Sequence, residues 1–317
     1  MAWPRPSTVR LRNYSRSSGQ GSGRARLVVS RSAGGGDTHV MDPLVEPPQI
    51  SIADARSKLD DSTFLALAAE SLITLPAWIT PITERVQQLH PSPGSRFEND
   101  DLLKPTNPPS EQVINLLRSA LDHLHTVADA VSEGGKGPRP LAPYTLIRAS
   151  IEASSLAVWV MTPGTKDARL KNSIRLSIAN RRATEVYNKK FDLGDHVSKW
   201  FKAEMIATKA QRPGTRNMNL DASFPRSTDL ILETDKRLVF SGLAGIDAWR
   251  ACSGIAHSNG QFAGAAVTRT ATEDSIVVTI KATTLFMMLE PAKQYLEFAL
   301  RAAERHMAAR SPSATRG

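Results

Sequence analysis

The sequence predicts a mainly α fold, an irregular helical bundle with one β-hairpin before the C-terminal helix. Apolar residues recur at helical spacing along the body, as at Val113, Leu117, Leu121 and Leu124, which is typical of amphipathic helices. The alternating strand–helix rhythm of an α/β fold is missing. Only residues 265–281 carry the period-two pattern of paired strands.

The first part of the body predicts short helices and a loop. Residues 52–59 and 62–75 have helical spacing, and two adjacent aspartates separate them. Pro76 is expected to end the second helix, because proline removes a backbone donor. Residues 82–89 form a third short helix before residues 90–109, where the many Pro, Gly, Ser and Asn residues indicate a loop.

The middle of the chain predicts the longest helices. A helix is expected from the N-cap candidate Ser110 to about Glu133, followed by a loop over residues 134–143. Residues 144–161 are almost wholly apolar and predict a central helix. Thr165 then caps a long basic helix that runs to about Phe191.

The last part of the chain holds the hairpin. Helices are expected at residues 197–209 and 242–257, and the Ser-Asn-Gly triplet at 258–260 is a suitable C-terminal stop. Strands at residues 265–270 and 275–281 follow. An amphipathic helix over residues 285–307 ends the body.

The composition excludes several classes of protein. The 317 residues are 41% hydrophobic and 22% charged, so collagen-like, disulfide-scaffold and wholly disordered chains are excluded. The single cysteine, Cys252, cannot form an internal disulfide or a structural zinc site, and a cytoplasmic location is expected. No window reaches the roughly 18 uninterrupted apolar residues of a membrane span, and no membrane partner is expected.

The positive charge lies at the two ends of the chain. Residues 1–40 hold seven arginines and one acid, and residues 301–317 hold four arginines and one acid. The remainder holds 29 basic and 29 acidic groups and is neutral. Long-range attraction to phosphate would therefore act through the terminal segments, where salt screens it.

Three segments are expected from this distribution. Residues 1–40 are predicted to be a disordered basic arm, and residues 41–310 a single helical domain. Residues 311–317 are predicted to be a disordered tail. The arm has three interpretations: an organelle transit peptide, a nucleic-acid arm, or a reading frame extended upstream of a true start at Met41. We favour the last interpretation, because a glycine run precedes Met41 as a translated ribosome-binding site would.

Two charges interrupt the predicted central helix. Arg148 and Glu152 lie one turn apart on one face, and a charge buried alone costs several kcal/mol. A functional interpretation is a polar binding pocket in which Glu152 meets His257, or Arg148 lies beside Arg250 as an anion clamp. The alternative is a buried ion pair that fixes the register of the helix.

A second polar stripe lies on the helix predicted at residues 242–257. Arg250 and His257 are seven residues apart, which is two turns, and Asp247 and Ser253 lie on the same stripe. An arginine can hold a phosphate while an imidazole moves a proton, and cleavage of RNA through its 2′-hydroxyl needs this pairing. Arg250 and His257 are the candidate catalytic residues. Arg148, Glu152, Asp247 and Ser253 are the candidate binding residues.

The run from Trp249 to His257 resembles the Arg-x(4–6)-His element of HEPN helical-bundle proteins. Many of these are metal-independent ribonucleases or nucleotide binders that work as dimers. The resemblance implies a phosphate-binding role for Arg250 and a catalytic role for His257. Ala251 replaces the polar residue that usually follows the arginine. The alternative for His257 is a histidine favourably placed at the negative end of the helix dipole.

A looser resemblance covers more of the chain. Residues 146–153, Trp159 and residues 250–260 resemble a group of bacterial helical-bundle proteins that has no assigned activity. This resemblance implies the fold and no function.

Two further patterns have a functional and a simpler interpretation. Asp122, His125 and Asp129 share one predicted helix face and have metal-ligand chemistry, but a solvated face is expected and no metal is predicted. The basic helix that ends at Phe191 has the charge to meet RNA phosphates, although the neutral body favours an ordinary solvated face.

The sequence therefore predicts an interaction or oligomerising module, with a homodimer as its candidate assembly. The alternative is a HEPN-like metal-independent ribonuclease or nucleotide-binding effector of a toxin or defence system, with RNA or a nucleotide as partner. No cofactor is predicted, because the chain has no dinucleotide fingerprint and no phosphate loop.

Overall fold

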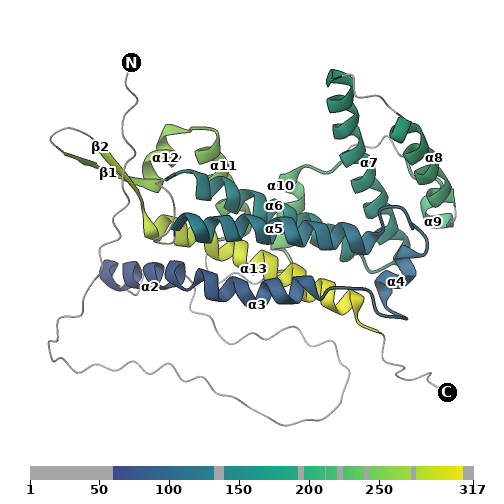
Figure 1. The fold of residues 1–317 in the computed structure, drawn as a ribbon, viewed down its shortest axis with the longest axis horizontal. Coiled ribbons are helices and arrows are strands. Elements are labelled where there is room, and N and C mark those ends of the chain that lie inside the picture. The colour runs from purple at the N-terminus through teal and green to yellow at the C-terminus, as the bar shows by residue number, and fades with distance from the viewer. Residues whose placement is uncertain are drawn as a thin grey trace, which may run out of the picture.

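The central helix of the molecule is α6 (Ala142–Met161), and the helices that pack against it include α5 (Pro109–Val131), α10 (Ser227–Asp235), α11 (Gly245–Ala256) and α13 (Ala282–Met307) (Figure 1). Because these helices cover α6 on most sides, its sequence is apolar almost throughout. The prediction of a central helix is confirmed.

The computed structural model describes residues 60–131, 139–191, 196–210, 212–219, 224–238, 243–272 and 276–309. Over these ranges it contains helices α2 to α13 and a single two-stranded antiparallel sheet. The predicted fold class is confirmed. The basic arm at residues 1–40, the helix at residues 52–59 and the tail at residues 311–317 lie outside the described residues.

One large hydrophobic core joins the helices of the bundle. Its fully buried side chains include Leu117 and Leu124 from α5, Ile147 and Ile151 from α6, and Leu296 from α13. α13 is amphipathic at helical spacing, as predicted, and it lies along the bundle for its whole length (Figure 1). Burial of such side chains stabilises a fold by about 1.5–3 kcal/mol each.

The N-terminal helices correct one boundary. α2 (Asp61–Ile73) ends close to where the sequence predicts, but α3 (Leu75–Gln87) begins directly after it. Pro76 lies in the first turn of α3 and does not stop the chain, because the first amide groups of a helix need no intrahelical partner. α3 also takes in Pro81, so the short helix predicted at residues 82–89 is the second half of a longer one.

Four short helices lie where the sequence predicted a loop or no element. α4 (Arg96–Asp101) interrupts the predicted loop at residues 90–109, and α9 (Pro213–Arg216) lies beside α8 (His196–Ala210). α10 was not predicted. α12 (Gly260–Ala266) precedes the hairpin. Each helix is too short for a helical repeat of apolar residues to be recognised in the sequence.

Only part of α7 (Lys166–Phe191) packs against the rest of the molecule. Its first half packs against α8 and α9 through a small apolar cluster that includes Leu170, Ile174 and Met205. Its second half rises out of the bundle at the end opposite to α2 (Figure 1). The long basic helix predicted here is confirmed.

The predicted stop after α11 is confirmed in detail. Ser258 has a left-handed backbone with φ 59°, and the amide of Asn259 donates to the carbonyl of Gly254 at 2.9 Å. This is the Schellman arrangement that satisfies the last carbonyl groups of a helix. β1 (Val267–Ala271) then pairs antiparallel with β2 (Ile276–Ile280), with Val267 opposite Ile280.

Among the described helices, none is by itself long and apolar enough to cross a membrane. α2 and α3 meet the criteria of length and composition only when taken together, as a pair bent by 42°.

Candidate functional site

Three side chains, Arg148, Glu152 and Trp249, form a polar trio at the contact between α6 and α11. Arg148 and Glu152, one turn apart on α6, form an ion pair with 3.1 Å between Nε and Oε1, and both side chains are about one quarter exposed. The indole Nε1 of Trp249 on α11 donates to the same Oε1 of Glu152 at 2.7 Å. The Arg148 guanidinium also lies over the Trp249 ring, 5.2 Å from its centroid.

This trio gives every charge in it a partner. The Glu152 carboxylate accepts from two donors, and Arg148 gains both a carboxylate and an aromatic face. The pairing of Arg148 with Glu152 that the sequence suggested is therefore present. No role was predicted for Trp249, although its position one residue before Arg250 was the available signal for an indole donor.

The other candidate residues lie on the outer face of α11. Arg250 and Asp247 are more than half exposed, at 59% and 54%, and their closest charged atoms are 3.8 Å apart. His257 is the exposed residue that directly follows α11, and its amide donates to the carbonyl of Ser253 at 2.9 Å. Arg250 and His257 thus both face solvent.

The two polar stripes therefore form two groups. Arg148 and Glu152 point into the α6–α11 contact, whereas Arg250, Asp247 and His257 lie at the surface. Among the described residues, the contacts of Glu152 are with Arg148 and Trp249 and include none with His257. Arg148 likewise makes no described contact with Arg250.

Cys252 lies on the buried side of α11. Burial raises the pKa of its thiol to about 12, and Arg148 offsets this only in part. A thiol that stays protonated at neutral pH is a poor nucleophile. Cys252 therefore serves the core.

A small cavity adjoins Glu152 between α6 and α10. It has a volume of about 50 Å³, and its lining includes Glu152, Ser155, Phe224 and Ser227. This volume is large enough for ordered water and too small for a substrate. Arg250 and His257 do not line this cavity.

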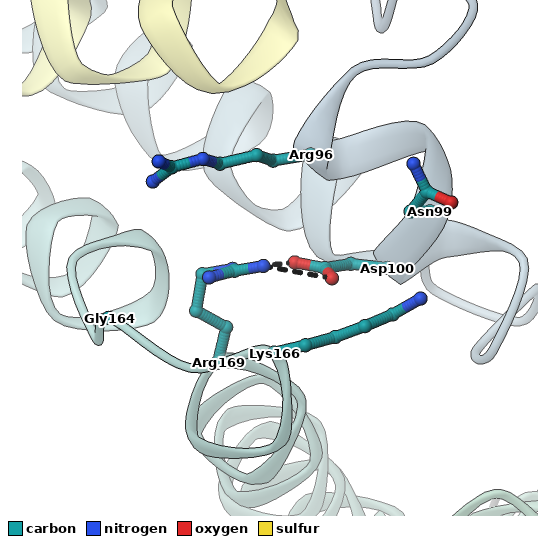
Figure 2. A pocket seen from close by; sticks show the side chains of 6 residues that line it. All are labelled: Arg96, Asn99, Asp100, Gly164, Lys166 and Arg169. Atoms are coloured by element: carbon teal, nitrogen blue, oxygen red, sulfur yellow. Dashed lines mark hydrogen bonds and ion pairs between the residues drawn. The ribbon is translucent and has the colours of Figure 1, made fainter. Parts of the chain in front are cut away.

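A second polar region joins α4 to the start of α7 (Figure 2). Arg169 donates through Nε to Oδ2 of Asp100 at 2.7 Å and through Nη2 to Oδ1 at 3.1 Å. A third bond from Nη1 goes to the carbonyl of Pro163 at 3.2 Å. The Arg169 and Asp100 side chains are 4% and 0% exposed. This is a bidentate ion pair sealed from water.

This region was not predicted, because the many Pro, Gly, Ser and Asn residues of 90–109 indicated a loop. A signal was present. Ser95 and Glu98 have the spacing of a capping box, and the Ser95 hydroxyl accepts from the amide of Glu98 at 3.1 Å. The helix that this motif starts places Phe97 and Asp100 on its buried side.

Lys104 is buried close to the same region. Its ammonium donates to the carbonyls of Thr106 and Asn107, and its side chain is fully buried. Burial lowers the pKa of Lys104 to about 7, although the charges of Glu204 and Asp101 act in the opposite direction. The fold therefore holds a lysine that titrates near neutral pH.

The described residues contain no group of three or more His, Cys, Asp or Glu side chains that could hold a metal ion. On the face proposed from Asp122, His125 and Asp129, His125 instead shares a hydrogen bond of 2.9 Å between its Nε2 and the Thr83 hydroxyl.

Comparisons of this chain with protein-family models, with curated proteins and with solved structures found no match.

Proposed function

We propose that the chain is a non-catalytic interaction module that assembles with a second copy of itself. The observation that carries the proposal is a pair of exposed apolar helix faces with opposite charge. One is the outer face of α2 and the other is the outer half of α7. They lie at opposite ends of the molecule (Figure 1).

The outer face of α2 is apolar and acidic. Its sequence is hydrophobic nearly all round, but only one side, with Phe64 and Ala68, is buried. Leu65 is 50% exposed and Ile73 is 76% exposed. A helix that is apolar on all sides is normally covered on all sides, so the exposed side favours a partner.

Among the residues of α2 and its N-cap, which the structure describes, three are acids and none is basic. Asp60, Asp61 and Glu70 are all exposed. Hydrogen bonds from the Ser62 hydroxyl and from Thr63 lower the pKa of Asp60 to about 2, so this carboxylate is charged at neutral pH.

The outer half of α7 is apolar and basic. Val186, Tyr187 and Phe191 are 71%, 57% and 54% exposed, and the Tyr187 and Phe191 rings lie 4.6 Å apart. Exposed Lys189 and Lys190 flank them. Exposed aromatic residues are typical of the centre of an interface, and charged residues are typical of its rim.

The two faces complement each other in charge and match in apolar character. Because they lie at opposite ends, one molecule cannot pair them, whereas two molecules related by a twofold axis pair each face with its counterpart twice. The charge complementarity favours a second copy over an unrelated protein. The local pairing of Arg148, Glu152 and Trp249 further supports a non-catalytic role for the α6–α11 contact.

Sedimentation velocity over a range of concentrations tests this proposal. The wild-type chain is expected to form a dimer that weakens as salt is raised, because salt screens the charges. The double variants Leu65→Lys/Ile73→Lys and Val186→Glu/Tyr187→Glu each place a like charge in the contact and are expected to be monomeric. The control Leu102→Lys/Leu232→Lys changes exposed leucines on neither face and should stay dimeric.

A wild-type chain that remains a monomer at every concentration would overturn the proposal. So would dimers that survive in both face variants.

A second candidate is the HEPN-like ribonuclease suggested by the Arg250–His257 spacing. It is favoured by one observation, the exposure of both residues, Arg250 in the middle of α11 and His257 directly after its C-terminal end. Purified protein would then cut single-stranded RNA without added metal, and His257→Ala would abolish cleavage with the melting temperature unchanged. Absence of cleavage by the parent protein, or equal cleavage by the variant, rejects this candidate.

A further inference from the structure

The loop between α4 and α5 folds around the buried amino group of Lys104. This side chain is fully buried, and its Nζ donates to the carbonyls of Thr106 and Asn107 in the same loop. Asn107 has a left-handed backbone with φ 53°, and its carbonyl also accepts from Nε2 of Gln112 at 3.0 Å. Its Nδ2 donates to the hydroxyl of Ser177 at 3.0 Å, so α7 reaches this loop through an uncharged group.

Three carboxylates from three elements act on this amino group: Asp101 of α4, Glu111 of α5 and Glu204 of α8. Both oxygens of Asp101 accept from Ser110, and Glu111 is exposed to water. Oε2 of Glu204, by contrast, is buried and has no hydrogen-bond partner in the described part of the chain. Glu204 is therefore the buried charge through which α8 acts on Lys104.

α8 is held by a small apolar cluster that is separate from the main core. It packs chiefly against α7 and α9 (Figure 1), and Met205 is its buried residue in this cluster. Leu103, the residue before Lys104, packs against the same cluster. Because few buried apolar side chains hold α8, we expect it to open at a lower free energy than the helices of the main core.

The surroundings of Lys104 suit its neutral form as well as its charged form. A neutral amine keeps two N–H groups, which is enough for the carbonyls of Thr106 and Asn107. Burial lowers the pKa of Lys104 from 10.5 to about 7, whereas Glu204 acts to raise it. A side chain released into water returns toward its ordinary pKa. Between these two pH values, an opening that exposes Lys104 must therefore take up a proton.

We propose that Lys104 and Glu204 form a pH-sensitive switch that controls how firmly α8 is held against the α4–α5 loop. In mildly basic solution Lys104 is neutral in the closed state, so the opening of α8 requires a proton and becomes less favourable as the pH rises. In mildly acidic solution Lys104 is already charged, and this requirement disappears. Glu204 stabilises the charged form and thereby places the transition near neutral pH.

The switch is separate from the two faces proposed for self-association. Neither Lys104 nor Glu204 lies on α2 or on the outer half of α7. The switch and the dimer can therefore each succeed or fail without the other.

Hydrogen–deuterium exchange of the full-length chain, measured by mass spectrometry, tests the switch. Peptides from α8 report its opening, and peptides from α6 report unfolding of the main core. α8 is expected to exchange faster than α6. After correction for the intrinsic pH dependence of exchange, the opening equilibrium of α8 should fall at least about tenfold from about pH 6.5 to about pH 8.5, because Lys104 then loses its proton only in the closed state.

Two variants assign this change to the proposed residues. Lys104→Met removes the titrating group, so the opening of α8 should be nearly equal at the two pH values. Glu204→Gln removes the charge that favours the ammonium, so the change should begin at a lower pH and be larger over the same range. The matched control is Lys171→Met, at an exposed lysine of α7, which should behave as the wild type does.

Three results would overturn the proposal. The first is an opening of α8 in the wild type that does not depend on pH, and the second is exchange of α8 only together with α6. The third is a pH dependence that survives in Lys104→Met, since another group would then titrate. If Lys104→Met does not fold, Glu204→Gln decides: a larger change than in the wild type supports the switch, and an equal or smaller change overturns it.

Discussion

The Asp100–Arg169 pair, which joins α4 to α7, and the Arg250–Asp247 pair, which lies within α11, differ in their access to water. Asp100 and Arg169 are sealed from solvent and bonded through two parallel hydrogen bonds. Arg250 and Asp247, on the outer face of α11, are more than half exposed and 3.8 Å apart. The contribution of an ion pair to the stability of the fold therefore depends on its burial and its hydrogen-bond geometry. Whether the pair can be recognised in the sequence does not indicate the size of this contribution.

The largest expected effect comes from breaking the sealed pair. Asp100→Ala leaves Arg169 buried with no carboxylate, and the free energy of unfolding should fall by about 3–5 kcal/mol. Urea unfolding followed by circular dichroism measures this. A loss below about 1 kcal/mol would mean that water already reaches the pair.

The buried side chain of Lys104 should make the stability of the fold depend on pH. Its folded pKa of about 7 lies below the ordinary value of 10.5, so between these values the unfolded chain binds more protons than the folded chain. Stability contributed by this group therefore rises with pH, by up to about 1.4 kcal/mol per pH unit.

The measurement for Lys104 compares wild type with Lys104→Met in urea at pH 7, 8 and 9. The difference between them should shift in favour of the wild type as the pH rises, because other titrating groups cancel. Parallel stability curves would show that Lys104 keeps an ordinary pKa.

The polar trio should have an intermediate effect. Trp249→Phe removes the indole donor to Glu152 but keeps an aromatic ring against Arg148, and the expected loss of stability is about 0.5–1.5 kcal/mol. Thermal unfolding compares this variant with Trp78→Phe, a change at a partly buried tryptophan outside the trio. Equal losses in the two variants would remove any special role for the Trp249–Glu152 bond.

The smallest effect is expected at the exposed pair. Arg250→Ala should change the free energy of unfolding by less than about 0.5 kcal/mol, because exposed pairs contribute little and are screened by salt. Thermal unfolding at low and high salt checks this. A loss above about 2 kcal/mol would show that Arg250 makes contacts beyond Asp247.

The sequence predicted those parts of the fold that have a long hydrophobic period. α5, α6 and α13 were each located within a few residues, because many turns repeat the same apolar face. α4 and α10 were missed because one or two turns carry little period. Pro76 was misinterpreted because its effect depends on its place in the helix, and a single residue does not reveal that place.

The candidate site shows the same limit. The i, i+4 spacing of Arg148 and Glu152 predicted their pairing, since this contact is local to one helix. The partners Trp249 and Asp100 come from other helices, 97 and 69 residues away in sequence from Glu152 and Arg169. Tertiary packing brings these residues together, and a pattern of neighbouring residues in the sequence does not predict such a contact.

The most direct test of self-association mixes the two face variants. Leu65→Lys/Ile73→Lys keeps its α7 face, and Val186→Glu/Tyr187→Glu keeps its α2 face, so a mixed pair retains one intact contact. Sedimentation of an equimolar mixture should show dimers that neither variant forms alone. A mixture that stays monomeric, while the wild type dimerises under the same conditions, would contradict pairing of α2 with α7.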